Sequence, residues 1–172
     1  MVDEEYKIEE RAQCSTDADN PDITLFKIKQ AIERFDKEIV GVGMSCPGPL
    51  DLIEGKILTT PNLHGKWHGL CITKELENLI HKPVYLENDA NLAALAETII
   101  GEGKEHNIVQ YLTVSTGLGA GLVINKKIFQ GAHGFANEVA NVCLWDNGPS
   151  HGSIYPGGVE ACLLYTSDAA DD

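Results

Sequence analysis

An Asn-Asp pair lies between a strand-like run and an apolar helical pattern, which is a favourable place for a chemically active carboxylate. Residues 84–86 suit a buried strand, and the residues after Asp89 have the spacing of an apolar helix. In an α/β sheet the carboxyl ends of the strands face the ligand crevice. We therefore expect Asp89 either to meet a ligand there or to cap the helix that follows it.

A glycine-rich segment between two predicted strands is the second candidate for ligand chemistry. Residues 109–114 are predicted to form a strand that runs into Ser-Thr-Gly-Leu-Gly-Ala-Gly (115–121), and another strand is expected from residue 122. Asn125-Lys126-Lys127 is expected to form a hairpin turn after that strand. Alternating glycines in a tight turn can point backbone N–H groups at phosphate oxygens. The same pattern also forms plain hairpins, and a following strand distinguishes it from the dinucleotide-binding GxGxxG motif. Both interpretations stay open at the level of the residues.

Two other segments place rigid or small residues where a ligand could be held. Pro47 and Pro49 fix the backbone on either side of Gly48, so a ligand could approach the main chain closely there. A plain strand-to-loop turn explains this pattern equally well. In Gly-Ala-His-Gly-Phe-Ala-Asn-Glu (131–138) a carboxylate follows small and apolar residues. Glu138 is therefore interpreted either as surface charge or as a ligand contact.

Strand and helix patterns alternate along the chain, which predicts an α/β fold. A buried strand is expected at 39–44, and helical spacing appears at 25–35, at 72–80 and after Asp89. Another helix is expected from Gly157 onwards. Residues 3–14 would suit an edge strand, but nothing in front of them supplies a partner strand. The glycines at 101–104 interrupt the helical pattern, and we place a domain boundary there.

The composition describes a globular and acidic protein. Apolar residues make up 43% of the chain, enough for a core, and the formal charge of -13 with scattered Lys and Arg argues against a nucleic-acid partner. There is no apolar run of the roughly 20 residues that span a bilayer, and the start does not resemble a signal peptide. A cytoplasmic location without a membrane partner is expected. The five cysteines form no CxxC pair, which predicts reduced and mostly buried thiols.

Six segments together resemble the ROK family of sugar kinases and sugar-sensing repressors. They are Gly-Met-Ser-Cys-Pro-Gly-Pro-Leu-Asp (43–51), Pro-Asn-Leu (61–63), Glu-Asn-Asp-Ala-Asn (87–91), Ser-Thr-Gly-Leu-Gly-Ala-Gly (115–121), Gly-Ala-His-Gly-Phe-Ala-Asn-Glu (131–138) and Gly-Gly-Val-Glu (157–160). They occur in the family's order. The resemblance implies an actin-like, ribonuclease-H-like α/β fold of two lobes with sugar and ATP meeting in the cleft. Residues 1–104 would form the first lobe and 105–161 the start of the second.

The resemblance also implies roles for individual residues. Asp89 matches the catalytic base that takes a proton from a sugar hydroxyl as it attacks the γ-phosphate of ATP. The sugar-binding positions are matched by Asn88, Glu138, Glu160, Gly48 and Asn62. The nucleotide-binding turn is matched by Thr116, Gly117 and Gly119. The implied cofactors are ATP and Mg²⁺, the implied substrate is a hexose or an amino sugar, and relatives commonly form homodimers.

The chain departs from the family pattern at its ends and at a metal site. It begins downstream of the family's Asp-x-Gly-Gly-Thr phosphate loop, and residues 162–172 resemble a non-native tail translated from a sequencing adapter. Many relatives bind zinc through one His and three Cys. The corresponding positions here are Asn141, His151, Ser153 and Gly158, so no zinc is expected.

The expected parent protein is an ATP-dependent sugar kinase, of which this chain is an internal fragment with little or no activity of its own. A sugar-responsive repressor carrying an N-terminal helix-turn-helix is the alternative, since the family includes both. A non-catalytic sugar-binding protein is the third interpretation. The motifs do not identify the sugar, because relatives with similar motifs handle different sugars.

Overall fold

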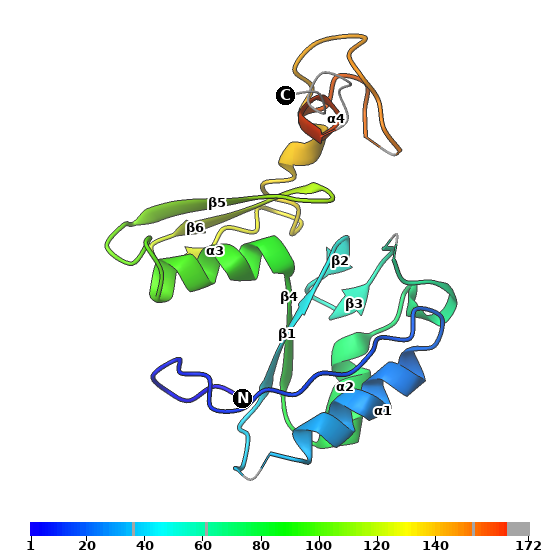
Figure 1. Ribbon diagram of the computed structural model, residues 1–172, viewed down its shortest axis with the longest axis vertical. Helices are drawn as coiled ribbons and strands as arrows, with labels where there is room; N and C mark the ends of the chain where they lie inside the picture. Colours follow the sequence, from blue (N-terminus) through cyan, green and yellow to red (C-terminus); the bar gives the residue numbers. More distant parts are fainter. Residues whose placement is uncertain (36, 61, 153, 165–172) are drawn as a thin grey trace. The chain divides into compact units, whose positions relative to one another are not determined.

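The structure is a computed structural model that describes residues 1–35, 37–60, 62–152 and 154–164 (Figure 1). The chain divides into two compact units, Met1–Asp89 and Ala90–Asp172, which are described separately below. This division groups the helix α3 (Asp89–Ile99) with the strands that follow it. The boundary expected at residues 101–104 concerns the lobes of the complete family fold and stays a prediction.

The first unit is built on two parallel strands, β1 (Val42–Cys46) and β4 (Val84–Asn88). Their register places Val42 opposite Val84 and Cys46 opposite Asn88. Because the strands run in the same direction without a stagger, both reach their carboxyl ends at the same edge of the sheet. That edge is where the Asn-Asp pair lies.

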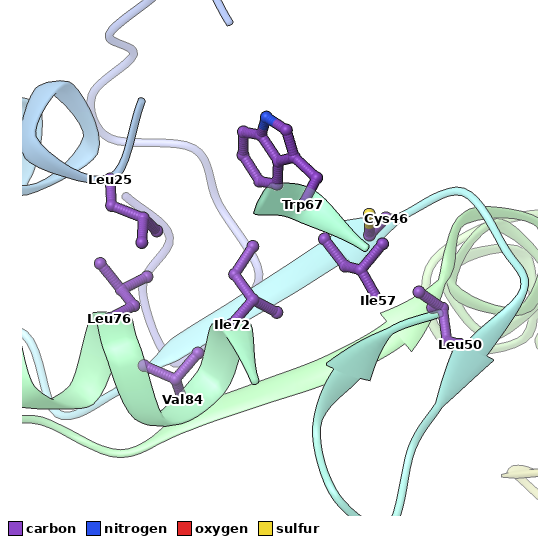
Figure 2. Packing of buried hydrophobic residues seen from close by; sticks show 8 residues of the cluster. All are labelled: Leu25, Cys46, Leu50, Ile57, Trp67, Ile72, Leu76 and Val84. Carbon is purple, nitrogen blue, oxygen red and sulfur yellow. The ribbon is translucent and has the colours of Figure 1, made fainter. Parts of the chain in front are cut away.

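One face of this sheet is covered by the helices α1 (Pro21–Ile32) and α2 (Ile72–Ile80) (Figure 1). Figure 2 shows the buried core that these helices form with the strands, which comprises Leu25, Cys46, Leu50, Ile57, Trp67, Ile72, Leu76 and Val84. Trp67 is only 3% exposed and ends the short 3-10 helix η1 (Gly65–Trp67). Its indole Nε1–H donates to the backbone oxygen of Asp17 at 2.9 Å, so the ring is buried without losing its hydrogen bond.

Local sequence explains where the helices begin and end. Asn20 caps α1 by accepting the N–H of Asp22 at 3.1 Å, and Pro21 occupies the first turn, where its missing N–H costs nothing. The predicted helix at 72–80 is confirmed as α2, and it ends at His81 in a left-handed conformation. The first helix is shorter than its apolar spacing predicted, because α1 ends at Ile32 and Phe35 lies beyond it.

Three expectations for the first unit were wrong. Residues 3–14 do not form an edge strand, and the pairing there is a single bridge between Val2 and Ile8. The strand expected at 39–44 starts later, at Val42, where β4 begins opposite it, and Val40 is 91% exposed. The strands are also less buried than predicted, since Tyr85 of β4 is 71% exposed on the face away from the helices. Apolar composition indicated burial on both faces, whereas the core of this unit covers one face.

After β1 the chain makes a short turn and enters a second, small sheet. The strands β2 (Leu50–Asp51) and β3 (Lys56–Ile57) pair antiparallel, and Ile57 is fully buried in the core described above. This pairing limits the turn to residues 47–49.

The second unit contains α3 and an antiparallel sheet in the order β5 (Ile108–Val114), β6 (Leu118–Ile124) and β7 (Lys127–Ile128). The predicted hairpin after β6 is confirmed: Asn125 and Lys126 both have positive φ, as the tight turn between two twisted strands requires. β6 begins at Leu118 rather than at residue 122, so Gly119 and Gly121 are paired strand residues opposite Thr113 and Tyr111.

α3 packs directly on the glycines of β6. A Cβ at Gly121 would lie 2.4 Å from the backbone oxygen of Ala90 and 2.9 Å from Cβ of Ala94. Only a residue without a side chain permits this approach. The glycines therefore allow α3 to pack on β6, a role beyond the turn that they were predicted to form.

The remainder of the unit contains the 3-10 helix η2 (Val139–Asn141), a loop described over 142–152 and 154–158, and the helix α4 (Val159–Leu164), which confirms the helix predicted near Gly157. The loop is closed by backbone hydrogen bonds, including Leu144 N–H to Gly157 O at 2.8 Å. The Trp145 side chain, also in this loop, is 53% exposed. Among the helices of the described residues, none is long and apolar enough to cross a membrane.

Candidate functional site

The first unit brings three predicted site residues to the carboxyl edge of its parallel strands. Asn88 ends β4 and Asp89 begins α3, as predicted for the strand-to-helix junction. The Gly48 turn follows β1, and a Cβ placed on Gly48 would lie 3.6 Å from Nδ2 of Asn88. The glycine therefore leaves the main chain open beside the Asn88 amide. Asp89 is exposed, so its carboxylate is accessible from solvent.

Cys46, the last residue of β1, also lies at this edge. Its proximity to Asp89 was not predicted from the sequence. Its thiol is buried in the core, and burial together with the negative charge of Asp89 raises its pKa from 9.0 to about 11. The thiol is therefore neutral at physiological pH. The only indication in the sequence was that Cys46 directly precedes Pro47 in the segment 43–51.

The cysteines as a group match the sequence expectation in part. All five are free, as predicted, but only Cys46 is buried, while Cys14 and Cys143 are exposed. The prediction of mostly buried thiols was therefore wrong.

The second unit joins two predicted site residues that are far apart in the sequence. Glu160 lies in the first turn of α4, and its Oε2 accepts the backbone N–H of Leu118 at 2.6 Å. The same oxygen would be 3.1 Å from a Cβ built on Gly117. The glycine turn thus already binds an anionic oxygen through its backbone, with no side chain in the way. This contact spans 42 residues, and no local pattern predicted it.

The other predicted residues of the second unit lie near this turn in sequence but in different environments. Thr116 is exposed within the turn, and Gly119 belongs to β6 rather than to the turn. Glu138 is exposed and directly precedes η2, which packs against β6 and α4. Their ligand-binding roles stay predictions.

Asn62, the remaining sugar-side candidate, lies in the first unit on an exposed turn. The flanking residues Thr60 and Leu63 form a bridge that closes this turn. Its role also stays a prediction.

The positions that correspond to a zinc site in relatives make other contacts here. Oδ1 of Asn141 accepts the backbone N–H of Tyr155 at 3.1 Å, and Gly158 pairs with Cys143. Ser153 lies outside the described residues. Within the described part of the chain, no group of three or more His, Cys, Asp or Glu residues could hold a metal ion. Backbone and amide hydrogen bonds hold this loop in the structure.

The structure contains the strand-to-helix junction at Asn88-Asp89 and the glycine-rich hairpin that carry the family resemblance. Residues 1–165 match the sequence profile of the ROK family, and the chain belongs to that family. Its solved relatives in the family have the actin-like ATPase fold, which confirms the predicted fold class.

Three relatives indicate the range of proteins to which the chain is similar. It is 33% identical to the xylose repressor of Bacillus spizizenii over 131 residues, which are 74% of this chain and 33% of the repressor. It is 33% identical to the glucokinase of Thermotoga maritima over 170 residues, which are 97% of this chain and 53% of that enzyme. The structure of a ROK family glucokinase from Streptomyces griseus in complex with glucose and AMPPNP matches with a TM-score of 0.77 and 29% identity, covering 92% of this chain and 51% of that one. The chain therefore spans about half of the glucokinases and a third of the repressor.

Proposed function

We propose that the complete protein transfers the terminal phosphoryl group of ATP to a hydroxyl group of a hexose or an amino sugar. The observation that carries the proposal is the exposed Asp89 carboxylate at the carboxyl edge of two parallel strands, beside Asn88 and the open Gly48 turn. Similarity to glucokinases over 97% of the chain supports it. The proposal concerns the complete protein, because the chain covers only 53% of that enzyme.

Asp89 is the proposed general base. Phosphoryl transfer depends mainly on positioning and on neutralising charge, and a carboxylate can accept the hydroxyl proton as the new bond forms. The Asn88 amide can both donate to and accept from a sugar hydroxyl, so it is suited to orienting the attacking group. The neutral Cys46 thiol adds no charge that would compete with the acid for the proton.

The glycine turn is the proposed contact for the nucleotide phosphates. Two observations support the binding of a phosphate at this turn. The Leu118 N–H binds a carboxylate oxygen, and at Gly117 no side chain blocks an anion. Thr116 adds an exposed hydroxyl beside it. Bound ATP with Mg²⁺ would supply the phosphoryl group and neutralise its charge. We assign no magnesium ligand among the described residues.

The test is Asp89→Asn in the complete protein, because the amide keeps the size of the side chain but cannot serve as the base. We expect the turnover rate to fall by roughly 10²- to 10⁴-fold, the usual contribution of general base catalysis. Release of ADP is measured with a panel of hexoses and amino sugars. Asp19→Asn is the matched control, since Asp19 is an exposed aspartate in the same unit. If the Asp89 variant keeps the original rate, or if the control loses as much, the assignment of the base is wrong.

A sugar-responsive repressor is the second candidate, supported by the 33% identity to the xylose repressor. A repressor would bind a sugar in calorimetry but would release no ADP in the kinase assay. A helix-turn-helix encoded upstream of this chain would favour the repressor, and an Asp-x-Gly-Gly-Thr loop would favour the kinase.

A further inference from the structure

One hydrogen bond joins Glu160 to the glycine turn. The family resemblance matches Glu160 to a sugar-binding position, and the turn that contains Gly117 is the proposed phosphate ligand. In the structure Oε2 of Glu160 accepts the Leu118 N–H at 2.6 Å, a short distance that is typical of a hydrogen bond to a charged acceptor. Glu160 is half-buried, which limits screening of its charge by water.

The Glu160 carboxylate and a bound phosphate would compete for the same donor, the Leu118 N–H. A backbone amide has a single N–H, so a phosphate oxygen cannot take the Leu118 hydrogen bond while Glu160 holds it. The carboxylate and the phosphate are also both negative, and two like charges a few ångströms apart repel each other strongly where water is partly excluded. Nucleotide binding at the full turn therefore requires Glu160 to leave Leu118.

Gly117 allows the carboxylate to lie directly on the turn, because it has no Cβ. A Cβ at this position would be only 3.1 Å from Oε2, closer than most side-chain contacts allow. The absence of that Cβ gives Glu160 the same access to the backbone that a phosphate would need. The carboxylate therefore occupies the position of an anionic ligand.

We propose that Glu160 blocks the phosphate-binding turn until a sugar draws its carboxylate away from Leu118, so that sugar binding primes nucleotide binding. Sugar hydroxyls are donors that can replace the Leu118 N–H as partners of the carboxylate. The inference rests on the proposed function, which assigns the phosphates to the turn, and it extends that function by assigning a sugar hydroxyl to Glu160. By linkage, the sugar strengthens nucleotide binding by the same factor as the nucleotide strengthens sugar binding.

The decisive measurement is nucleotide affinity in the absence of sugar. Calorimetry is carried out with AMP-PNP and Mg²⁺ on the complete protein, as wild type, Glu160→Gln and Glu160→Ala. Alanine removes the competing acceptor, and we expect it to bind AMP-PNP roughly tenfold more tightly than wild type. Glutamine keeps a weaker, uncharged acceptor, so its affinity should fall between the other two. In wild type, the sugar with the highest turnover in the panel should tighten AMP-PNP binding by a similar factor.

Glu105→Gln provides the matched control, since Glu105 is an exposed glutamate in the same unit and outside the proposed site. It should leave AMP-PNP affinity unchanged. Unchanged or weaker AMP-PNP binding in both Glu160 variants would overturn the inference. If wild type still phosphorylates a sugar in that case, only the inference fails. Absence of both phosphorylation and AMP-PNP binding in wild type would overturn the proposed function as well.

A second measurement uses unaltered protein and does not depend on the folding of a variant. The backbone amide proton of Leu118 is followed by NMR in protein labelled with ¹⁵N-leucine. A proton bonded to a carboxylate resonates downfield, so saturating sugar should move it upfield as Glu160 departs. A Leu118 resonance that does not respond to a sugar that binds would show that the carboxylate stays in place, and the inference would be rejected.

Discussion

Gly121→Ala is expected to destabilise the second unit by forcing α3 away from β6. The added Cβ would lie 2.4 Å from the Ala90 oxygen, and real Cβ atoms essentially never approach other atoms within 3.0 Å. The helix and strand must therefore separate by more than half an ångström, and the obstructing atom belongs to the backbone and cannot rotate away. Overpacking of this kind typically costs about 1–3 kcal/mol, and a backbone obstruction favours the upper end of that range.

Hydrogen exchange followed by mass spectrometry measures this loss locally. If exchange follows the opening equilibrium, a loss of about 1–3 kcal/mol accelerates exchange by roughly 5- to 150-fold in peptides that cover β5 and β6. Peptides that cover β1 and β4 belong to the other unit and should change little.

Gly43→Ala is the matched control for this substitution. A Cβ at Gly43 of β1 meets no atom within 4 Å, so the same chemical change should alter stability by less than about 0.5 kcal/mol. If Gly121→Ala leaves protection of 108–124 unchanged, or if Gly43→Ala is equally destabilising, the close packing of α3 on β6 is not what the glycine permits.

Two further predictions concern the first unit. Because the pKa of Cys46 is raised from 9.0 to about 11, its thiolate is scarce at pH 8, and we expect alkylation by iodoacetamide to be about 100-fold slower than at the exposed Cys14. Peptide mass spectrometry after timed alkylation checks this, and equal rates at the two cysteines would contradict it. Leu76→Ala removes a fully buried side chain from the core and should lower the free energy of unfolding by about 2–5 kcal/mol in urea titrations. Lys74→Ala, at an exposed position of the same helix, should change it by less than about 0.5 kcal/mol, and similar losses in both variants would refute the packing argument.

The features that the sequence predicted well are those encoded by neighbouring residues. The junction at Asn88-Asp89, the helix at 72–80 and the turn at Asn125-Lys126 all depend on spacing or turn chemistry within a few positions. The family resemblance added the fold, because several weak motifs in order are more specific than any one of them.

What the sequence did not predict depends on which segments meet in space. Residues 3–14 have strand-like composition, but a strand requires a pairing partner, and only Val2 and Ile8 pair there. The contact between Glu160 and Leu118 joins residues 42 positions apart, and nothing in either local pattern indicates it. The glycines of β6 were interpreted as phosphate-binding N–H groups or as part of a plain hairpin, whereas the structure shows that Gly121 also accommodates α3.

The two tryptophans of the chain give each unit its own optical signal. Trp67 is enclosed in the first core at 3% exposure, whereas Trp145 of the second unit is 53% exposed. Their fluorescence should differ accordingly, with blue-shifted emission from the enclosed indole and red-shifted, readily quenched emission from the hydrated one. Replacing either tryptophan by phenylalanine would leave a single tryptophan, so with excitation selective for tryptophan the melting of each unit could be followed by itself.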